Sequence, residues 1–242
     1  MASGNYQDTI SASVRQPGPH PEMRMPQLQP QLINIALHVL AGSAAIGLGL
    51  FLLAMAKGTP AHRRHGRQFA WLTLLVCATA AVGNVLFGYR PVFAVLTVLV
   101  LYQLLSGWRA IYTRDAGPQA VDGAMTAAAL AAGLLILLRL RQDASGQQAI
   151  VVLSSLGGLA TIVVYDSARW LFPRRWHGVL WRYEHIYKLL ASLFAMLSAA
   201  AGNLLRVGQP WTQLAPSLLG LLCIAWFWRR QYRQEAARAG AR

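Results

Sequence analysis

The sequence predicts an all-α fold, a polytopic membrane helix bundle with seven transmembrane helices. Seven apolar segments alternate with short polar ones along 242 residues, and apolar residues make up 55% of the chain against 12% for charged residues. The mean hydropathy is +0.39, and a soluble domain of this size cannot hide so much apolar surface. A soluble enzyme, a nucleic-acid-binding protein and a disordered protein are therefore excluded as descriptions of the whole chain.

The seven segments follow a polar N-terminal tail, residues 1–31, which is rich in Pro, Gln and Ser and is expected to be disordered. Most segments are close to the ~20 residues that a helix needs to cross ~30 Å of hydrocarbon. In lipid, backbone polar groups must be satisfied within the segment, so each one is expected to be a helix. Together they form one transmembrane domain, 32–230, ahead of a basic cytoplasmic tail, 231–242. In chain order the segments cover 32–56, 68–88, 91–112, 119–138, 148–171, 184–205 and 211–228.

The distribution of Lys and Arg predicts the orientation, because cytoplasmic loops accumulate these residues. Of the 22 Lys and Arg residues, 16 lie on one side of the predicted membrane and 6 on the other. The N-terminus is therefore expected outside, and the C-terminus in the cytoplasm, of a bacterial cytoplasmic (inner) membrane. The expected partners are the lipid bilayer and other membrane proteins, and no nucleic acid, because the charges sit in short loops. The poorer side holds Arg15, Arg24, Arg90, Arg139, Arg141 and Arg206.

An internal similarity relates the second and sixth spans. The second span ends in AAVGN at Asn84 and the sixth in AAAGN at Asn203, and a proline follows each Asn seven residues later, Pro91 and Pro210. Basic loops containing Arg-Arg and His-Gly precede both spans. Because spans 1–3 and 5–7 have the same orientation, the pattern suggests a 3+1+3 parallel repeat, as in some transporter folds. Chance similarity between Ala-rich helices explains it equally well.

Polar side chains at membrane depth are the candidate functional residues, because placing them there is costly. Near the outer end, Asn34 and His38 lie one turn apart on one helical face, and Asn84, Tyr89 and Asn203 are expected at similar depth. The group near the cytoplasmic end comprises His62, His65, Asp122, Asp166, His177, Glu184, His185 and Lys188.

The inner group has three interpretations. It is a structural charge network if Asp166 pairs with Arg169 or Arg109 and Glu184 pairs with Lys188 at i,i+4. It is a haem site if an imidazole of His62 or His65 and another of His185 ligate one iron from both faces. It is a divalent metal site, with a position left for an activated water, if two or three histidines act with an aspartate. That metal set would be drawn from His62, His65, His185, Asp166 and Asp122.

His38 is a further candidate ligand, although a hydrogen-bonded helix-packing histidine is the more common role. The spacing favours no single interpretation. The sequence has no HxxxH or HExxH motif, which would place two ligands on one helical face.

Several motifs together resemble a bacterial family of uncharacterised multi-span membrane proteins, a domain of unknown function with H-R-x-x-G-R after the first span. Here that motif is His62-Arg63-Arg64-His65-Gly66-Arg67, and the resemblance covers about residues 34–230. It implies a polytopic membrane protein and supplies no settled activity. The other stretches that carry it are HVLAG from His38, LYQLLSGWRA from Leu101, HIYKLLA from His185, and WRR from Trp228.

The residues that this resemblance singles out are His38, His62, Gly66, Arg109 and His185, and it makes His62 a better candidate than His65. A looser similarity is to cytochrome b561-type proteins, in which pairs of histidines hold two haems. The chain departs from that pattern, because its histidines do not form in-helix pairs at both membrane faces. The similarity therefore implies one inner haem at most.

The leading functional hypothesis is a membrane redox or assembly component that binds haem b or a divalent metal at a histidine site near its cytoplasmic face. A small solute transporter is the alternative suggested by the repeat and the outer Asn/His cluster. A seven-helix membrane metallohydrolase is the alternative suggested by the inner His and Asp residues. A non-catalytic partner subunit is the fourth hypothesis.

Overall fold

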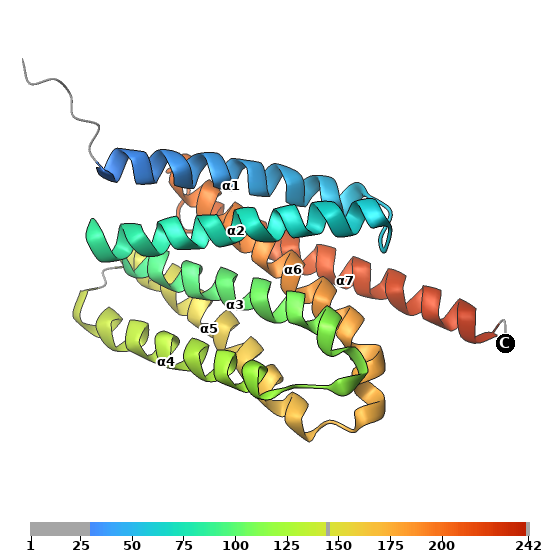
Figure 1. The fold of residues 1–242 in the computed structure, drawn as a ribbon. Helices are drawn as coiled ribbons and strands as arrows, with labels where there is room; N and C mark the ends of the chain where they lie inside the picture. The colour runs from blue at the N-terminus through green and yellow to red at the C-terminus, as the bar shows by residue number, and fades with distance from the viewer. Residues whose placement is uncertain (1–29, 144–145, 241–242) are drawn as a thin grey trace, which may run out of the picture.

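The computed structural model describes residues 30–143 and 146–240, and within these ranges it contains seven long helices and no strand (Figure 1). Each of the seven is long and apolar enough to cross a membrane, which confirms the all-α, seven-span prediction and indicates a multi-pass membrane protein. The helices are α1 (Pro30–Ala54), α2 (Pro60–Leu86), α3 (Pro91–Thr113), α4 (Ala120–Asp143), α5 (Gly146–Ala168), α6 (Arg174–Leu204) and α7 (Trp211–Gly240), with short 3-10 turns at Arg114–Ala116 and Arg169–Leu171.

The helices are longer than the apolar segments that predict them. α2 already begins at Pro60, where proline suits the first helical position and the Thr59 hydroxyl caps the helix by accepting from His62 N at 3.1 Å. α6 begins at Arg174, directly after Pro173. The basic segments ahead of spans two and six are therefore largely helical, because arginine is a good helix former and these turns lie outside the apolar segments.

The two ends of the chain also differ from the predicted boundaries. Residues 1–29 of the expected tail lie outside the described residues, and 30–31 are the first residues of α1. The basic tail expected from residue 231 continues α7 as a helix to Gly240. Figure 1 shows this last part of α7 extending past the ends of the neighbouring helices.

α3 and α6 pack along each other and form the centre of the bundle. α1 and α2 lie against one side of this pair, α4 and α5 pack on α3 at the other side, and α7 packs on α6 (Figure 1). The outward faces are rich in exposed apolar side chains, such as Leu135 and Leu222, as expected where lipid replaces water as the solvent.

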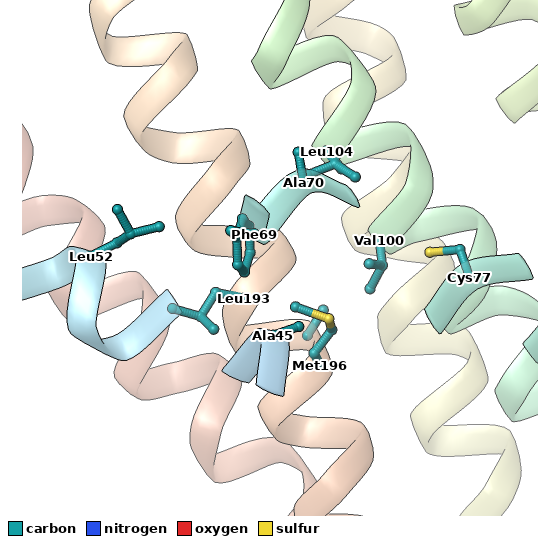
Figure 2. Packing of buried hydrophobic residues seen from close by; sticks show 10 residues of the cluster. Ala45, Leu52, Phe69, Ala70, Cys77, Val100, Leu104, Leu193 and Met196 are labelled. Atoms are coloured by element: carbon teal, nitrogen blue, oxygen red, sulfur yellow. The ribbon is translucent and has the colours of Figure 1, made fainter. Parts of the chain in front are cut away.

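The main apolar core joins α1, α2, α3 and α6 (Figure 2). Small residues let these helices approach closely, which is the usual way that membrane helices pack. At Gly107 of α3, an added Cβ would lie 2.7 Å from Lys188 Cβ of α6 and would also overlap Leu189. The buried residues of this core are Ala45, Leu52, Phe69, Ala70, Cys77, Val100, Leu104, Leu193, Ala195 and Met196.

The proposed repeat is matched locally but not in packing. Asn84 of α2 donates to Ala80 O at 3.2 Å, and Asn203 of α6 donates to Ala199 O at 2.8 Å, so both asparagines bond within their own helix. The first helices of the two halves differ, however. α1 packs along α2, whereas α5 packs mainly on α3 and α4.

Candidate functional site

Most of the predicted site residues lie at one end of the bundle, where α1, α3, α5 and α7 end and α2, α4 and α6 begin. We call this the basic end, because it also carries the Arg-rich segments. His62 and His65 lie in the first turns of α2, and His185 lies in the N-terminal half of α6. Asp122 lies at the start of α4 and Asp166 near the end of α5.

A buried ion pair between α5 and α6 is the centre of this end. Lys188 Nζ lies 2.6 Å from Asp166 Oδ1, and the two side chains are 0% and 5% exposed. The Tyr102 hydroxyl of α3 donates to Asp166 Oδ2 at 2.7 Å and also contacts Thr126 Oγ1 of α4 at 2.8 Å. Both carboxylate oxygens of Asp166 are thus satisfied, as a buried charge requires.

A second buried ion pair adjoins the first. Arg169 Nε lies 2.9 Å from Glu184 Oε1, at an angle unsuited to a hydrogen bond, and Arg169 Nη1 lies 3.7 Å from Asp166 Oδ1. The Tyr165 hydroxyl donates to Glu184 Oε1 at 2.9 Å. Two cations and two carboxylates therefore face one another, so the network is formally neutral, which is the arrangement that makes buried charges tolerable.

Arg109 and Asp122 form a third pair nearer the surface. The Arg109 guanidinium donates to both carboxylate oxygens, at 2.5 and 3.1 Å, a bidentate geometry that strengthens the pair. Gln119 N donates to the same carboxylate at 2.8 Å and so ties it to the first turn of α4. Of the predicted pairings, Asp166 with Arg169 is confirmed.

Arg169 is thus the observed one of the two expected partners of Asp166, and the expected Glu184–Lys188 pair is not formed within the described residues. Arg109 pairs with Asp122 instead of Asp166, because Asp122 lies across the short connection between α3 and α4. Lys188 pairs with Asp166 on α5 instead of with Glu184 on its own helix.

A cavity of about 10 Å³ lies beside the network, between α3, α4 and α5. Its volume matches roughly one water molecule, which polar surroundings can hold by hydrogen bonds. It is far too small for an organic solute. The lining residues are Tyr102, Ser106, Asp122, Met125, Thr126, Asp166 and Arg169.

His185 and His62 form a second feature of the basic end. His185 Nδ1 donates to Gly107 O at 3.0 Å, which leaves Nε2 as the ring atom with a free lone pair. His62 Nδ1 is buried and has no hydrogen-bond partner in the described part of the chain. The two rings lie within electrostatic range of each other, and Lys57 lies within the same range of His62. Neither ring forms an ion pair with a carboxylate in the described residues.

The five-residue metal set is not assembled. His65 Nδ1 donates to Gln68 Oε1 at 2.8 Å, and Asp122 and Asp166 are engaged by Arg109 and by Lys188. Across residues 30–143 and 146–240, no three His, Cys, Asp or Glu side chains gather in a way that could hold a metal ion. The two carboxylates expected as metal ligands, Asp122 and Asp166, form salt bridges instead.

His38 lies at the opposite end of the bundle and has a packing role. Its Nδ1 lies 2.9 Å from Thr79 Oγ1 of α2, and Asn34 donates to Thr79 O at 3.0 Å. The outer Asn/His pair thus joins α1 to α2. It is separated from His62 and His185 by most of the length of the helices.

Sequence reasoning missed the residues that satisfy the charges. The hydroxyls of Tyr102 and Tyr165 donate to Asp166 and Glu184, and both tyrosines lie in apolar segments of the sequence. Gly117 was missed as well. It adopts a left-handed φ of +75° with the buried His177 ring against it, so that an added Cβ would lie 2.9 Å from His177 Nε2.

The sequence matches no protein-family model, and no curated protein and no solved structure shows significant similarity to it. The geometry of the basic end is therefore the basis for assigning a function.

Proposed function

We propose that the protein is a multi-pass redox or assembly component of the bacterial cytoplasmic membrane, and that His62 and His185 hold a haem b or a single metal ion at its basic end. The observation that carries the proposal is the hydrogen bonding of the two imidazole rings. His185 is oriented by a backbone carbonyl, as ligating histidines commonly are, and the buried His62 Nδ1 has no partner in the described residues.

The donor set favours haem over a hydrolytic metal centre. Two neutral imidazoles from different helices suffice for an iron already held by a porphyrin. Catalytic zinc instead takes three protein ligands, and no such group is present among the described residues. A haem bound there would supply one-electron transfer.

The orientation is part of the proposal, with the basic end facing the cytoplasm. A reporter that is active only outside the cytoplasm should work when fused near Arg141 and fail when fused after Arg230. The opposite pattern would reverse the topology.

The test of the ligand pair is an absorption spectrum and elemental analysis of the full-length protein purified in detergent. A Soret band, with α and β bands on reduction, supports haem, and stoichiometric metal without colour supports a metal ion. His62→Ala and His185→Ala should each remove the bound group. The matched control is His38→Ala, which lies at the far end and should retain it. Protein lacking both haem and metal, or unchanged content in the two ligand variants, would refute the proposal.

A second candidate, proton conduction through the bundle, is favoured by the water-sized cavity beside the Asp166–Lys188 pair. A buried carboxylate beside a site for one water is suited to proton transfer and not to solute binding. In liposomes carrying a pH-sensitive dye, Asp166→Asn should abolish proton flux, and Asp115→Asn, at an aspartate outside the cavity lining, should leave most of it. Equal flux in Asp166→Asn and the parent protein would exclude this role.

A further inference from the structure

An open groove runs between α1 and α2 on the outer surface of the bundle. Its volume is about 610 Å³. Only one of its lining side chains is polar, and Trp71 is 65% exposed in it. The Trp71 ring is fixed by an edge-to-face contact with Trp108 of α3, with ring centroids 6.3 Å apart. The lining residues are Ala44 and Leu48 of α1 and Gln68, Trp71, Leu72 and Leu75 of α2.

The dimensions of the groove suit one acyl chain. Gln68 and Leu75 are seven residues apart, about 10 Å along the helix at 1.5 Å per residue. One leaflet of the hydrocarbon core is about 15 Å deep. The groove therefore spans most of one leaflet, starting about two turns inside the basic end of α2.

Positive charge at the mouth of the groove has no counter-charge nearby in the sequence. Lys57, Arg63, Arg64 and Arg67 lie in this hairpin, and no acidic residue occurs between Glu22 and Asp115. Burial, with repulsion from Arg230, lowers the pKa of the Lys57 amine. A cluster of Lys and Arg residues at a membrane surface attracts anionic lipid headgroups.

Arg64 and Gln68 are the donors aligned with the groove. At 100° per residue, Arg64 lies about 40° from Gln68 around α2 and about 6 Å nearer the basic end. His65 Nδ1 occupies the carbonyl oxygen of Gln68 and leaves its amide NH2 as a donor. In the described part of the chain, Arg64 forms no hydrogen bond or ion pair. Arg63 lies about 140° from Gln68, on the far side of the helix.

We propose that this groove is a binding site for an anionic phospholipid, with one acyl chain along Trp71 and the phosphate held by Arg64 and Gln68. Guanidinium and amide donors suit phosphate oxygens, and the apolar lining suits the chain. The site is independent of any group at His62 and His185.

The experiment uses the full-length protein in bilayers and follows quenching of Trp71 by phospholipids with brominated acyl chains. The signal from Trp71 is the difference between the protein and its Trp71→Phe variant. Brominated phosphatidylglycerol is titrated into unlabelled phosphatidylcholine, and brominated phosphatidylcholine is titrated in a parallel series. Phosphatidylglycerol should reach half-quenching at a mole fraction at least about five-fold lower, which is the contribution of a single Arg near the surface.

Two charge variants make the test local. Arg64→Gln should raise the half-quenching mole fraction of phosphatidylglycerol about five-fold, whereas Arg63→Gln removes the same charge from the opposite face and should leave it unchanged. Ala44→Phe fills the groove and should weaken quenching by both lipids. Equal quenching by the two lipids in the parent protein, or equal effects of Arg63→Gln and Arg64→Gln, would overturn the site.

Discussion

Removing the charge of Lys188 tests whether the buried network is balanced. The Lys188→Met substitution keeps an unbranched apolar stem of similar length and removes the ammonium, which lies 2.6 Å from Asp166 on a side chain that is 0% exposed. The four-charge network would then retain two carboxylates and only one cation, Arg169. Breaking a buried ion pair by removing one partner typically costs about 3–5 kcal/mol, because the other charge stays buried.

The expected loss lies at the low end of that range. At a fixed dielectric, attraction falls as the inverse of distance, so Arg169 at 3.7 Å supplies roughly 70% of the attraction that Lys188 supplies at 2.6 Å. Asp166 also keeps its hydrogen bond from Tyr102. We therefore expect Lys188→Met to reduce the free energy of unfolding by about 3 kcal/mol.

The double variant Lys188→Met/Asp166→Leu should be more stable than Lys188→Met alone. It leaves Arg169 with Glu184 as a neutral pair, and Tyr102 keeps its contact with Thr126. Replacing both members of a buried pair with apolar residues is often neutral or stabilising, so we expect a loss of about 1 kcal/mol or less.

The assay is equilibrium unfolding of the full-length protein in mixed micelles with increasing SDS, followed by tryptophan fluorescence. Lys57→Met is the matched control, because the Lys57 ammonium contacts the carbonyls of Leu52, Leu53 and Met55 and the ring of Phe227, and no carboxylate among the described residues, so its loss should cost about 1 kcal/mol or less. A loss below about 1 kcal/mol for Lys188→Met, or a double variant that loses the sum of the two single losses, would refute the reasoning.

The same unfolding assay tests three further predictions. Gly107→Ala should cost about 1–3 kcal/mol, because the new methyl group overlaps α6, whereas Gly157→Ala adds its methyl to open space and should be neutral or stabilising by up to about 1 kcal/mol; equal midpoints would contradict this. Tyr165→Phe should cost about 1.5–3 kcal/mol, because it removes a donor to the buried Glu184 carboxylate, and an unchanged midpoint would mean that the bond contributes little. Thr79→Val should cost about 1 kcal/mol, because it removes the hydroxyl that binds His38, and an unchanged unfolding midpoint would contradict this.

The number and type of the helices could be predicted from the sequence, and their ends could not. Hydropathy detects the part of a helix that lies in hydrocarbon, and it therefore finds 184–205 but not the start of α6 at Arg174. The first turns of that helix are polar, and arginine has a high helix propensity in water. Local capping features, such as Thr59 before Pro60, give better boundaries than hydropathy.

The residues of the charge network could be predicted, but most of its pairings could not. Sequence spacing favours partners on the same helix, such as Glu184 with Lys188. The structure instead directs Lys188 across to α5 and Glu184 to Arg169. These choices depend on how α3, α5 and α6 pack, which spacing along one helix does not encode. Only the Asp166–Arg169 contact, at i,i+3, is local enough to have been derived.

The surroundings of each candidate histidine depend on how the helices pack, and the sequence indicates them only in part. Placing His62 and His185 at the same end follows from the order of the spans. The hydrogen bond from His185 to Gly107 O requires the close approach of α3 and α6 that a glycine permits. His65 is one turn from His62, yet its ring binds Gln68 of the same helix. Gln68 lines the groove between α1 and α2.

The cations at the basic end are of two kinds, those paired with a carboxylate and those without one among the described residues. Three cations, Arg109, Arg169 and Lys188, are matched by carboxylates within the bundle, so they contribute little field at the surface. The cations of the α1–α2 hairpin have no such partners in their own segment. These hairpin cations are one part of the excess positive charge at the basic end, and they are the part that lies beside His62 and the mouth of the groove. The rest lies at the start of α6 and along the end of α7, at Arg174, Arg175, Arg229, Arg230, Arg233 and Arg238. An anionic ligand, whether a haem carboxylate or a lipid phosphate, should respond to salt and to Arg→Gln changes in α2, and much less to changes within the neutral network.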